Sequence, residues 1–142
     1  MDLYRFVCPI QVRYGDLDPQ GHVNNARILT YIEQARITYL QTLALWDGGS
    51  FLDLGLIVAD VHVSYLAPIT LKQSVEVGMR VSRLGNKSLT FEYQVEDAES
   101  HVALARGETV MVAYDYHQHA SIPVPQGWRE AIAGYEGIAL RA

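Results

Sequence analysis

The stretch that decides the fold runs from Arg13 to Arg36 and reads RYGDLDPQGHVNNARILTYIEQAR. Its first half is rich in Gly, Pro, Asp and Asn, which is typical of a loop, and its second half carries apolar residues at helical spacing. The sequence therefore places a carboxylate, Asp18, a few residues ahead of a helix N-terminus. Unpaired backbone N–H groups at such a terminus can stabilise a developing negative charge, an arrangement that suits acyl transfer.

The helical pattern extends from about Asn24 to Trp46, which predicts a helix of about six turns. Its apolar arc exceeds half of the circumference, so we expect a helix that is enclosed on several sides rather than resting on a surface. Glu33 and Arg36 fall within that wide arc. As charges there they should be paired or line a cavity, and an ion pair between them is the favoured interpretation.

Elsewhere the apolar residues alternate with period two, which predicts strands before and after the helix. The expected strands cover residues 6–14, 57–65, 75–81, 89–95 and 102–114. A tight turn is expected at Gly85 and Asn86, and a bulge near Arg106 and Gly107. One face of the second strand should hold Ile57, Ala59, Val61, Val63 and Tyr65. Residues 117–125 read as an exposed linker, and Gln126 to Gly134 as a short helix after Pro125.

The 142 residues fit one domain, 1–142, with 49% hydrophobic residues. A net charge of −5 argues against nucleic-acid binding, and no apolar run is long enough to span a membrane. The first residues lack the pattern of a secretory signal, so we expect a cytoplasmic location. The single cysteine, Cys8, alternates with apolar residues and should be a buried hydrophobe without a chemical role.

One strand, one long enclosed helix and four antiparallel strands define an α+β domain whose curved sheet can wrap the helix. This order and the loop resemble the hotdog fold, and specifically the 4-hydroxybenzoyl-CoA thioesterase-like acyl-CoA thioesterases. The sharpest part of the resemblance is DLDPQGHVNN, from Asp16 to Asn25, followed by Tyr31, Ile32, Glu33 and Arg36. Ile28 departs from the aromatic residue that many members carry there, which bears on the shape of the acyl pocket.

The resemblance implies hydrolysis of an acyl-CoA thioester, with Asp18 as the catalytic aspartate, acting as general base or as nucleophile. It also implies that backbone N–H groups around Val23, Asn24 and Asn25 polarise the thioester carbonyl, helped by the helix dipole. The two asparagines are good capping residues as well. Asp16 is expected to make hydrogen bonds within the turn.

The remaining candidates are expected to touch the substrate. Gly21 permits a close approach of the backbone, and His22 can act as an acid, orient a water or make structural hydrogen bonds. Glu33 is a further candidate on the helix. Around the Gly85 turn, the resemblance places the coenzyme A contacts at Ser82, Arg83, Lys87 and Ser88. No cofactor is needed, because water and a carboxylate suffice for thioester hydrolysis.

Other interpretations stay open on the sequence alone. The substrate could be an acyl-carrier-protein thioester, or the protein could be a non-catalytic acyl-CoA-binding module; a dehydratase or hydratase is less favoured, because the acid and histidine arrangement of that class is not found. Asp115, His117 and His119 could in principle ligate a metal, but a solvated polar segment is the preferred interpretation. Exposed sheet edges favour association with a partner, and the resemblance implies a homodimer paired edge to edge or a homotetramer built from it.

Overall fold

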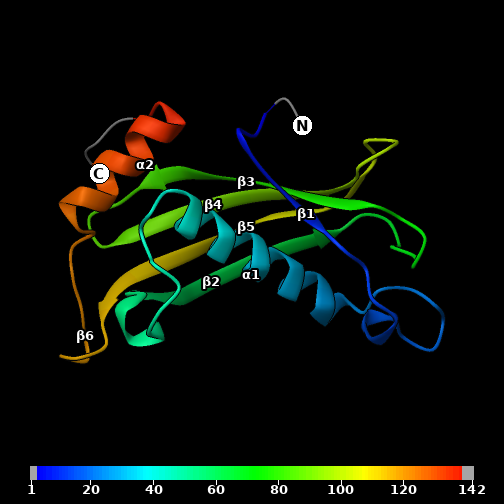
Figure 1. Ribbon diagram of the computed structural model, residues 1–142, viewed down its shortest axis with the longest axis horizontal. Coiled ribbons are helices and arrows are strands. Elements are labelled where there is room, and N and C mark those ends of the chain that lie inside the picture. Colours follow the sequence, from blue (N-terminus) through cyan, green and yellow to red (C-terminus); the bar gives the residue numbers. More distant parts are fainter. Residues whose placement is uncertain (1–2, 139–142) are drawn as a thin grey trace.

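The computed structural model describes residues 3–138, which form one sheet and two α-helices (Figure 1). The strands are β1 (Phe6–Ile10), β2 (Leu56–Tyr65), β3 (Val75–Leu84), β4 (Ser88–Asp97), β5 (Ala103–Asp115) and β6 (Ala120–Ser121). The α-helices are α1 (Asn25–Thr42) and α2 (Gln126–Glu136), and short 3₁₀ turns occupy Tyr14–Asp16 and Phe51–Asp53. Among these residues, neither helix is both long and apolar enough to cross a membrane.

The sheet is antiparallel throughout, with strand order β1-β3-β4-β5-β2, and the short β6 pairs with the end of β5. The long helix α1 lies against the face of the sheet seen in Figure 1, with β1 along one flank. A single long helix held by a curved antiparallel sheet is the hotdog arrangement that the sequence predicts. The two free edges of the five-stranded path are β1 and β2.

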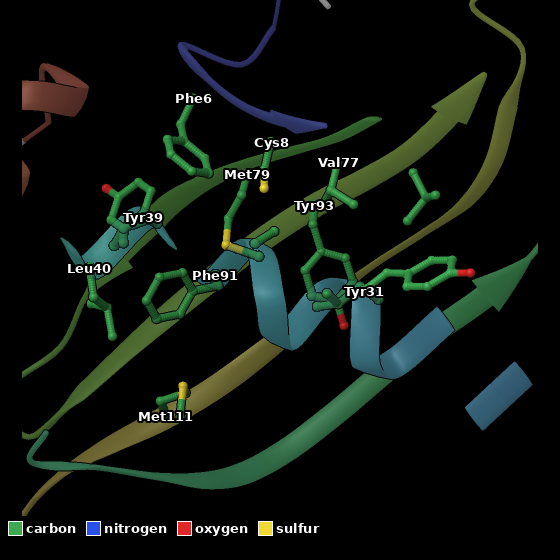
Figure 2. Close-up of a cluster of buried hydrophobic side chains, with 14 of the residues drawn as sticks. Phe6, Cys8, Tyr31, Tyr39, Leu40, Val77, Met79, Phe91, Tyr93 and Met111 are labelled. Carbon is green, nitrogen blue, oxygen red and sulfur yellow. The ribbon is translucent and has the colours of Figure 1, made fainter. Parts of the chain in front are cut away.

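The core fills the space between α1 and the sheet (Figure 2). Tyr39 of α1 makes edge-to-face contacts to Phe6, Phe91 and Tyr135 at ring-centroid distances of 5.4, 5.7 and 5.9 Å. Such edge-to-face packing is the favoured geometry for aromatic rings. Cys8 is buried in the same cluster, as predicted. Buried residues of α1 extend from Ile28 to Leu40, so the core fixes the helix on the sheet along most of its length.

The helix α1 is shorter than predicted, because it ends at Thr42 and not near Trp46. The Leu45 N–H donates to Leu40 O and the Ala44 N–H donates to Gln41 O, which is the Schellman motif. Ala44 adopts the left-handed backbone conformation of that motif, with φ of 57°. Glycine is the usual residue there, so an alanine gives no sequence signal for the end of the helix.

Both ends of the chain also depart from the prediction. The first strand stops at Ile10, and Tyr14, expected in that strand, lies in a 3₁₀ turn with its side chain 83% exposed. The expected linker after residue 117 contains the short strand β6, and Val124 within it is buried. The helix α2 runs two residues further than predicted, to Glu136.

The predicted face of β2 is confirmed for Val61, Val63 and Tyr65 but is wrong for Ile57, because a bulge between Val58 and Asp60 reverses the alternation. Val58 pairs with the buried Met111 and Val61 pairs with the buried Thr109, so both point toward the inner face. Ile57 lies on the opposite face. Because β2 is at the sheet edge, these side chains stay partly uncovered, at 41% for Ile57, 44% for Val58 and 47% for Val61.

The bulge expected near Arg106 and Gly107 is displaced. The register between β4 and β5 shifts where Val95 pairs with Ala105 and Glu96 pairs with Ala103, which leaves Leu104 as the extra residue. Gly107 breaks the pattern for another reason: a Cβ there would lie 2.0 Å from His62 O of the neighbouring strand. The glycine therefore permits a close backbone approach inside a regular ladder.

Candidate functional site

The loop that carries Asp18 is a tight turn from Asp18 to His22. The Gly21 N–H donates to Asp18 O (3.0 Å) and the Asp18 N–H donates to His22 O (2.8 Å). Gly21 has a φ of 79°, which a glycine adopts without strain, and Pro19 favours the first turn position. The loop is therefore shaped by the same residues that mark it in the sequence.

The Asp18 carboxylate is half-buried and uses only one oxygen in this turn. Asp18 Oδ1 accepts from the Gln20 N–H (2.9 Å) and from the His22 N–H (3.1 Å). Within residues 3–138, no donor reaches Asp18 Oδ2. One oxygen therefore holds the side chain in a fixed orientation, while the other remains able to take a proton or to attack a carbonyl.

Asp16, two residues earlier, has a partner at each of its two carboxylate oxygens. Its Oδ2 accepts from the Tyr31 hydroxyl (2.6 Å) and from the Arg13 N–H (3.0 Å), and its Oδ1 lies 4.0 Å from Arg27 Nε. Burial alone would raise the pKa of the Asp16 carboxyl, but these donors and the charge of Arg27 outweigh it and hold the pKa below its ordinary value. The hydrogen-bonding role predicted for Asp16 is confirmed.

The start of α1 offers one uncommitted N–H group among the three expected ones. The Val23 N–H donates to Ile69 O (2.8 Å) and the Asn24 N–H donates to Asp16 O (2.9 Å). Asn24 is the N-cap, because its side-chain Oδ1 accepts from the Ala26 N–H (2.8 Å). Asn25 is the first helical residue, and within the part of the chain that the structure describes its N–H has no acceptor.

Long-range contacts that the sequence pattern did not reveal hold this helix start in place. The Tyr65 hydroxyl, at the end of β2, donates to Asn25 O (3.4 Å), and Ile69 supplies the carbonyl for Val23. The Tyr31 hydroxyl holds Asp16 from within α1. No short-range pattern signals Tyr65 or Ile69, because each reaches the loop only through the folded chain. Tyr31 belongs to the motif noted in the sequence, but its contact with Asp16 appears only in the structure.

A cleft of about 530 Å³ runs along the flank of α1 that faces the β2 side of the sheet. Its lining is mostly apolar and comes from α1, from the segment after it and from the sheet; it includes Ile37, Leu40, Trp46, Phe51, Leu56 and Met111. Glu33 and Arg36 also line it, with Glu33 Oε2 and Arg36 Nη2 4.0 Å apart. The Glu33 side chain is exposed, so the predicted ion pair is a loose one.

The predicted coenzyme A contacts lie far from Asp18 within one chain. They occupy the hairpin between β3 and β4: Arg83, Lys87 and Ser88. Lys87 O accepts from the Ala113 N–H, and Ala113 pairs with Leu56 at the start of β2. Asn25, by contrast, meets the end of β2 at Tyr65. The ten residues of β2 span about 30 Å, and Figure 1 shows the hairpin and the loop at opposite ends of the sheet.

The polar segment after β5 forms a turn. Asp115 Oδ1 accepts from the N–H groups of His117 and Gln118, and His117 Nε2 lies 3.4 Å from Asp53 Oδ1. Across residues 3–138, no three His, Cys, Asp or Glu side chains gather as metal ligands would.

Comparison with known proteins places this arrangement in a family. Residues 12–132 match the model of the thioesterase-like superfamily. A thioesterase crystal structure from Thermus thermophilus, complexed with coenzyme A and Zn, is 36% identical, with a TM-score of 0.86 over 98% of this chain and 99% of that one. The 1,4-dihydroxy-2-naphthoyl-CoA hydrolase of Synechocystis sp. is 26% identical over 86% of this chain and 90% of its own length. The Escherichia coli O6:H1 acyl-CoA thioester hydrolase YbgC is 26% identical, covering 81% and 86%.

The fold and these matches define a hotdog protein of the thioester-hydrolysing class. The chain belongs to the thioesterase-like superfamily. The sequence prediction of a thioester hydrolase is thereby confirmed at the level of the family.

Proposed function

We propose that this protein hydrolyses acyl-CoA thioesters, with Asp18 as the reacting carboxylate and the Asn25 N–H as the group that polarises the carbonyl. One observation carries the proposal: Asp18 is fixed through Oδ1 while Oδ2 stays available, next to a helix start with one uncommitted N–H. The partial positive charge of a helix N-terminus adds to the stabilisation of a carbonyl oxygen that becomes negative. The names of the relatives above support the same activity.

Asp18 can act by two routes. As a general base it takes a proton from water, the hydroxide adds to the thioester carbon, and the C–S bond breaks to leave the acid and the coenzyme A thiolate, which is then protonated. As a nucleophile Oδ2 itself adds to that carbon, the thiolate leaves, and water hydrolyses the resulting anhydride. A single turnover in H₂¹⁸O separates the routes, because attack by Asp18 allows ¹⁸O to enter its carboxylate.

The proposed coenzyme A contacts require a second copy of the chain. The free edge of β2 and its uncovered Val58 and Val61 are suited to antiparallel pairing with the β2 of a partner. That pairing would bring the partner's hairpin end of the sheet to the Asp18 end of this one. We therefore propose a homodimer, or a tetramer built from it. A mass of 15.9 kDa by size exclusion with light scattering would contradict this.

Thiol release from a panel of short, medium, long and aromatic acyl-CoAs tests the activity. The parent should hydrolyse at least one class, and Asp18→Asn should lose about 100-fold or more in kcat, the scale of a lost catalytic base. The amide keeps Oδ1 as an acceptor, so the turn should be preserved. His22→Gln, at a further candidate for substrate contact, should act mainly on KM. Gly21→Ala should also strain the turn that holds Asp18, because Gly21 has a φ of 79°.

Three outcomes would redirect the proposal. Binding of acyl-CoA without turnover would favour the non-catalytic binding module. Hydrolysis of acyl-carrier-protein thioesters, and not of acyl-CoA, would keep Asp18 as the reacting carboxylate and change the proposed substrate. Equal rates for the parent and Asp18→Asn would remove Asp18 from the mechanism.

A further inference from the structure

The turn between β3 and β4 is held by the C-terminal part of the chain. The Gly85 N–H donates to Ser88 O (2.8 Å), which closes the turn. Gly85 O and Asn86 O both accept from Arg129 Nη2, the second at 2.9 Å. Asn86 O also accepts from the Val124 N–H (2.9 Å). The C-terminal segment therefore contacts the turn through the main-chain atoms that set its shape.

The guanidinium of Arg129 is well suited to this contact. Its Nη2 carries two hydrogens and donates to the carbonyl groups of two adjacent residues. Hydrogen bonds from a charged donor are stronger than those between neutral groups. The contact joins residues that are 44 and 43 positions apart, so it forms only when α2 packs on the sheet.

The helix that carries Arg129 is also anchored at its other end. Glu136 Oε2, in the last turn of α2, accepts from the Tyr39 hydroxyl of the core (2.7 Å) and from the Val81 N–H of β3 (3.0 Å). Between the two ends, Ile132 is buried. Figure 1 shows α2 beside the hairpin end of β3. Arg129 therefore reaches the turn from a helix that is itself fixed on the core.

The same hairpin carries the cations that we assign to coenzyme A. Arg83 and Lys87 are exposed, and they lie two residues to either side of Gly85. Groups that are mobile before binding lose conformational freedom when they meet a ligand, which weakens the affinity. A turn that is fixed in advance reduces this loss.

We propose that Arg129 is a positioning residue for coenzyme A, because it holds the turn so that Arg83 and Lys87 are ready to meet the phosphates of the nucleotide. It acts through the main chain of the turn and does not touch the substrate. The inference rests on the proposed function and on the hairpin as the coenzyme A site. Loss of Arg129 should weaken recognition of the nucleotide and spare the chemistry at Asp18.

Arg129→Gln, which removes the charge and the contact with both carbonyl groups, tests the inference. KM for acyl-CoA should rise about 3- to 10-fold with kcat within about twofold, the scale of ordering one or two side chains. The N-acetylcysteamine thioester of the same acid lacks the nucleotide, and its kcat/KM should stay within about twofold. A general loss of folded protein would instead reduce the rates with both substrates. Glu130→Gln, at the exposed neighbour on α2, is the control and should match the parent.

A double-mutant cycle separates positioning from direct contact with the substrate. In a protein that already carries Arg83→Ala and Lys87→Ala, Arg129→Gln should raise KM by less than about twofold, because the cations that it positions are gone. If the increases in KM multiply instead, Arg129 acts on the substrate independently of the hairpin cations, and the inference is overturned.

Amide hydrogen exchange tests the positioning without any substrate. The Gly85 N–H should exchange at least 10-fold faster in Arg129→Gln, because the turn that it closes has lost its support from α2. Arg129→Lys keeps the charge and can still donate to one carbonyl group, so its exchange rate and its KM should both be intermediate. It also replaces Arg129→Gln if that variant fails to fold. An exchange rate equal to that of the parent would overturn the inference.

Failure of this inference can be distinguished from failure of the proposed function. A parent that neither hydrolyses acyl-CoA nor binds coenzyme A in calorimetry would contradict the proposed function, and this inference with it. An active parent whose KM is unchanged by Arg129→Gln would overturn this inference alone.

Discussion

Two neighbouring parts of the same loop use their carboxylates in opposite ways. In the stretch from Arg13 to Leu17, both oxygens of Asp16 have partners, and the pKa of the carboxyl is lowered. In the stretch from Asp18 to His22, the carboxylate of Asp18 is held through one oxygen only. The comparison indicates that a carboxylate with partners at both oxygens has a structural role. A carboxylate at a helix start that uses only one oxygen in hydrogen bonds is instead a candidate for catalysis.

Removal of one backbone N–H at the helix start should have the largest effect. Asn25→Pro deletes the only donor that we assign to the thioester carbonyl, and kcat should fall about 100- to 1,000-fold. Proline is favoured at the first helical position, and Asn24 already has the extended ψ of 140° that a residue before proline needs. Steady-state kinetics beside thermal unfolding would measure both effects.

Asn25→Ala is the matched control, because it keeps the N–H and removes the same side chain. Its kcat should stay within a few-fold of the parent. Equal losses in both variants would assign the effect to the asparagine side chain and not to the backbone.

Asp16→Asn should affect stability more than chemistry. It weakens the charge-assisted hydrogen bonds from Tyr31 and the Arg13 N–H, so we expect a loss of about 1.5–3 kcal/mol in the free energy of unfolding. Urea unfolding measures that loss. A stable Asp16→Asn protein with little activity would instead give Asp16 a direct role.

Tyr31→Phe should shift the acid limit of stability. The folded-state pKa of Asp16 is lowered, so its contribution is present above the unfolded-state pKa of about 3.9 and is lost as the pH falls through the folded value. Without the Tyr31 donor the folded pKa rises, and acid unfolding should begin at a higher pH. Circular dichroism during acid titration measures the shift, and Tyr14→Phe, an exposed tyrosine, should match the parent.

The hairpin substitutions should have the smallest effect. Arg83→Ala and Lys87→Ala, both at exposed cations, should each raise KM for acyl-CoA about 3- to 10-fold and leave kcat within about twofold. A dephospho-CoA thioester, which lacks the 3′-phosphate, should reduce the difference between variant and parent. Unchanged KM values for both substrates would remove the hairpin from the coenzyme A site.

The sequence predicted the long helix, the antiparallel strands and the Asp18 loop because each has a local signal. Two predictions failed for physical reasons. The end of α1 was missed because Ala44 adopts a conformation usually taken by glycine, and the side on which Ile57 lies was missed because no glycine or proline marks the bulge after Val58. The sequence also predicts that the N–H groups of Val23 and Asn24 are available to polarise the thioester carbonyl. Their acceptors are Ile69 O and Asp16 O, the first of them far along the chain, and no local pattern reveals the pairing. The cytoplasmic location stays a prediction.

The most direct test of the account compares Asp18→Asn with Asp16→Asn, each assayed for kcat on the best acyl-CoA and for free energy of unfolding. The account predicts a crossed result: Asp18→Asn loses about 100-fold or more in kcat and keeps nearly the parent stability, while Asp16→Asn loses stability and, when folded, retains most of its kcat. The opposite pattern, or equal kcat for Asp18→Asn and the parent, would contradict the assignment of Asp18 as the reacting carboxylate.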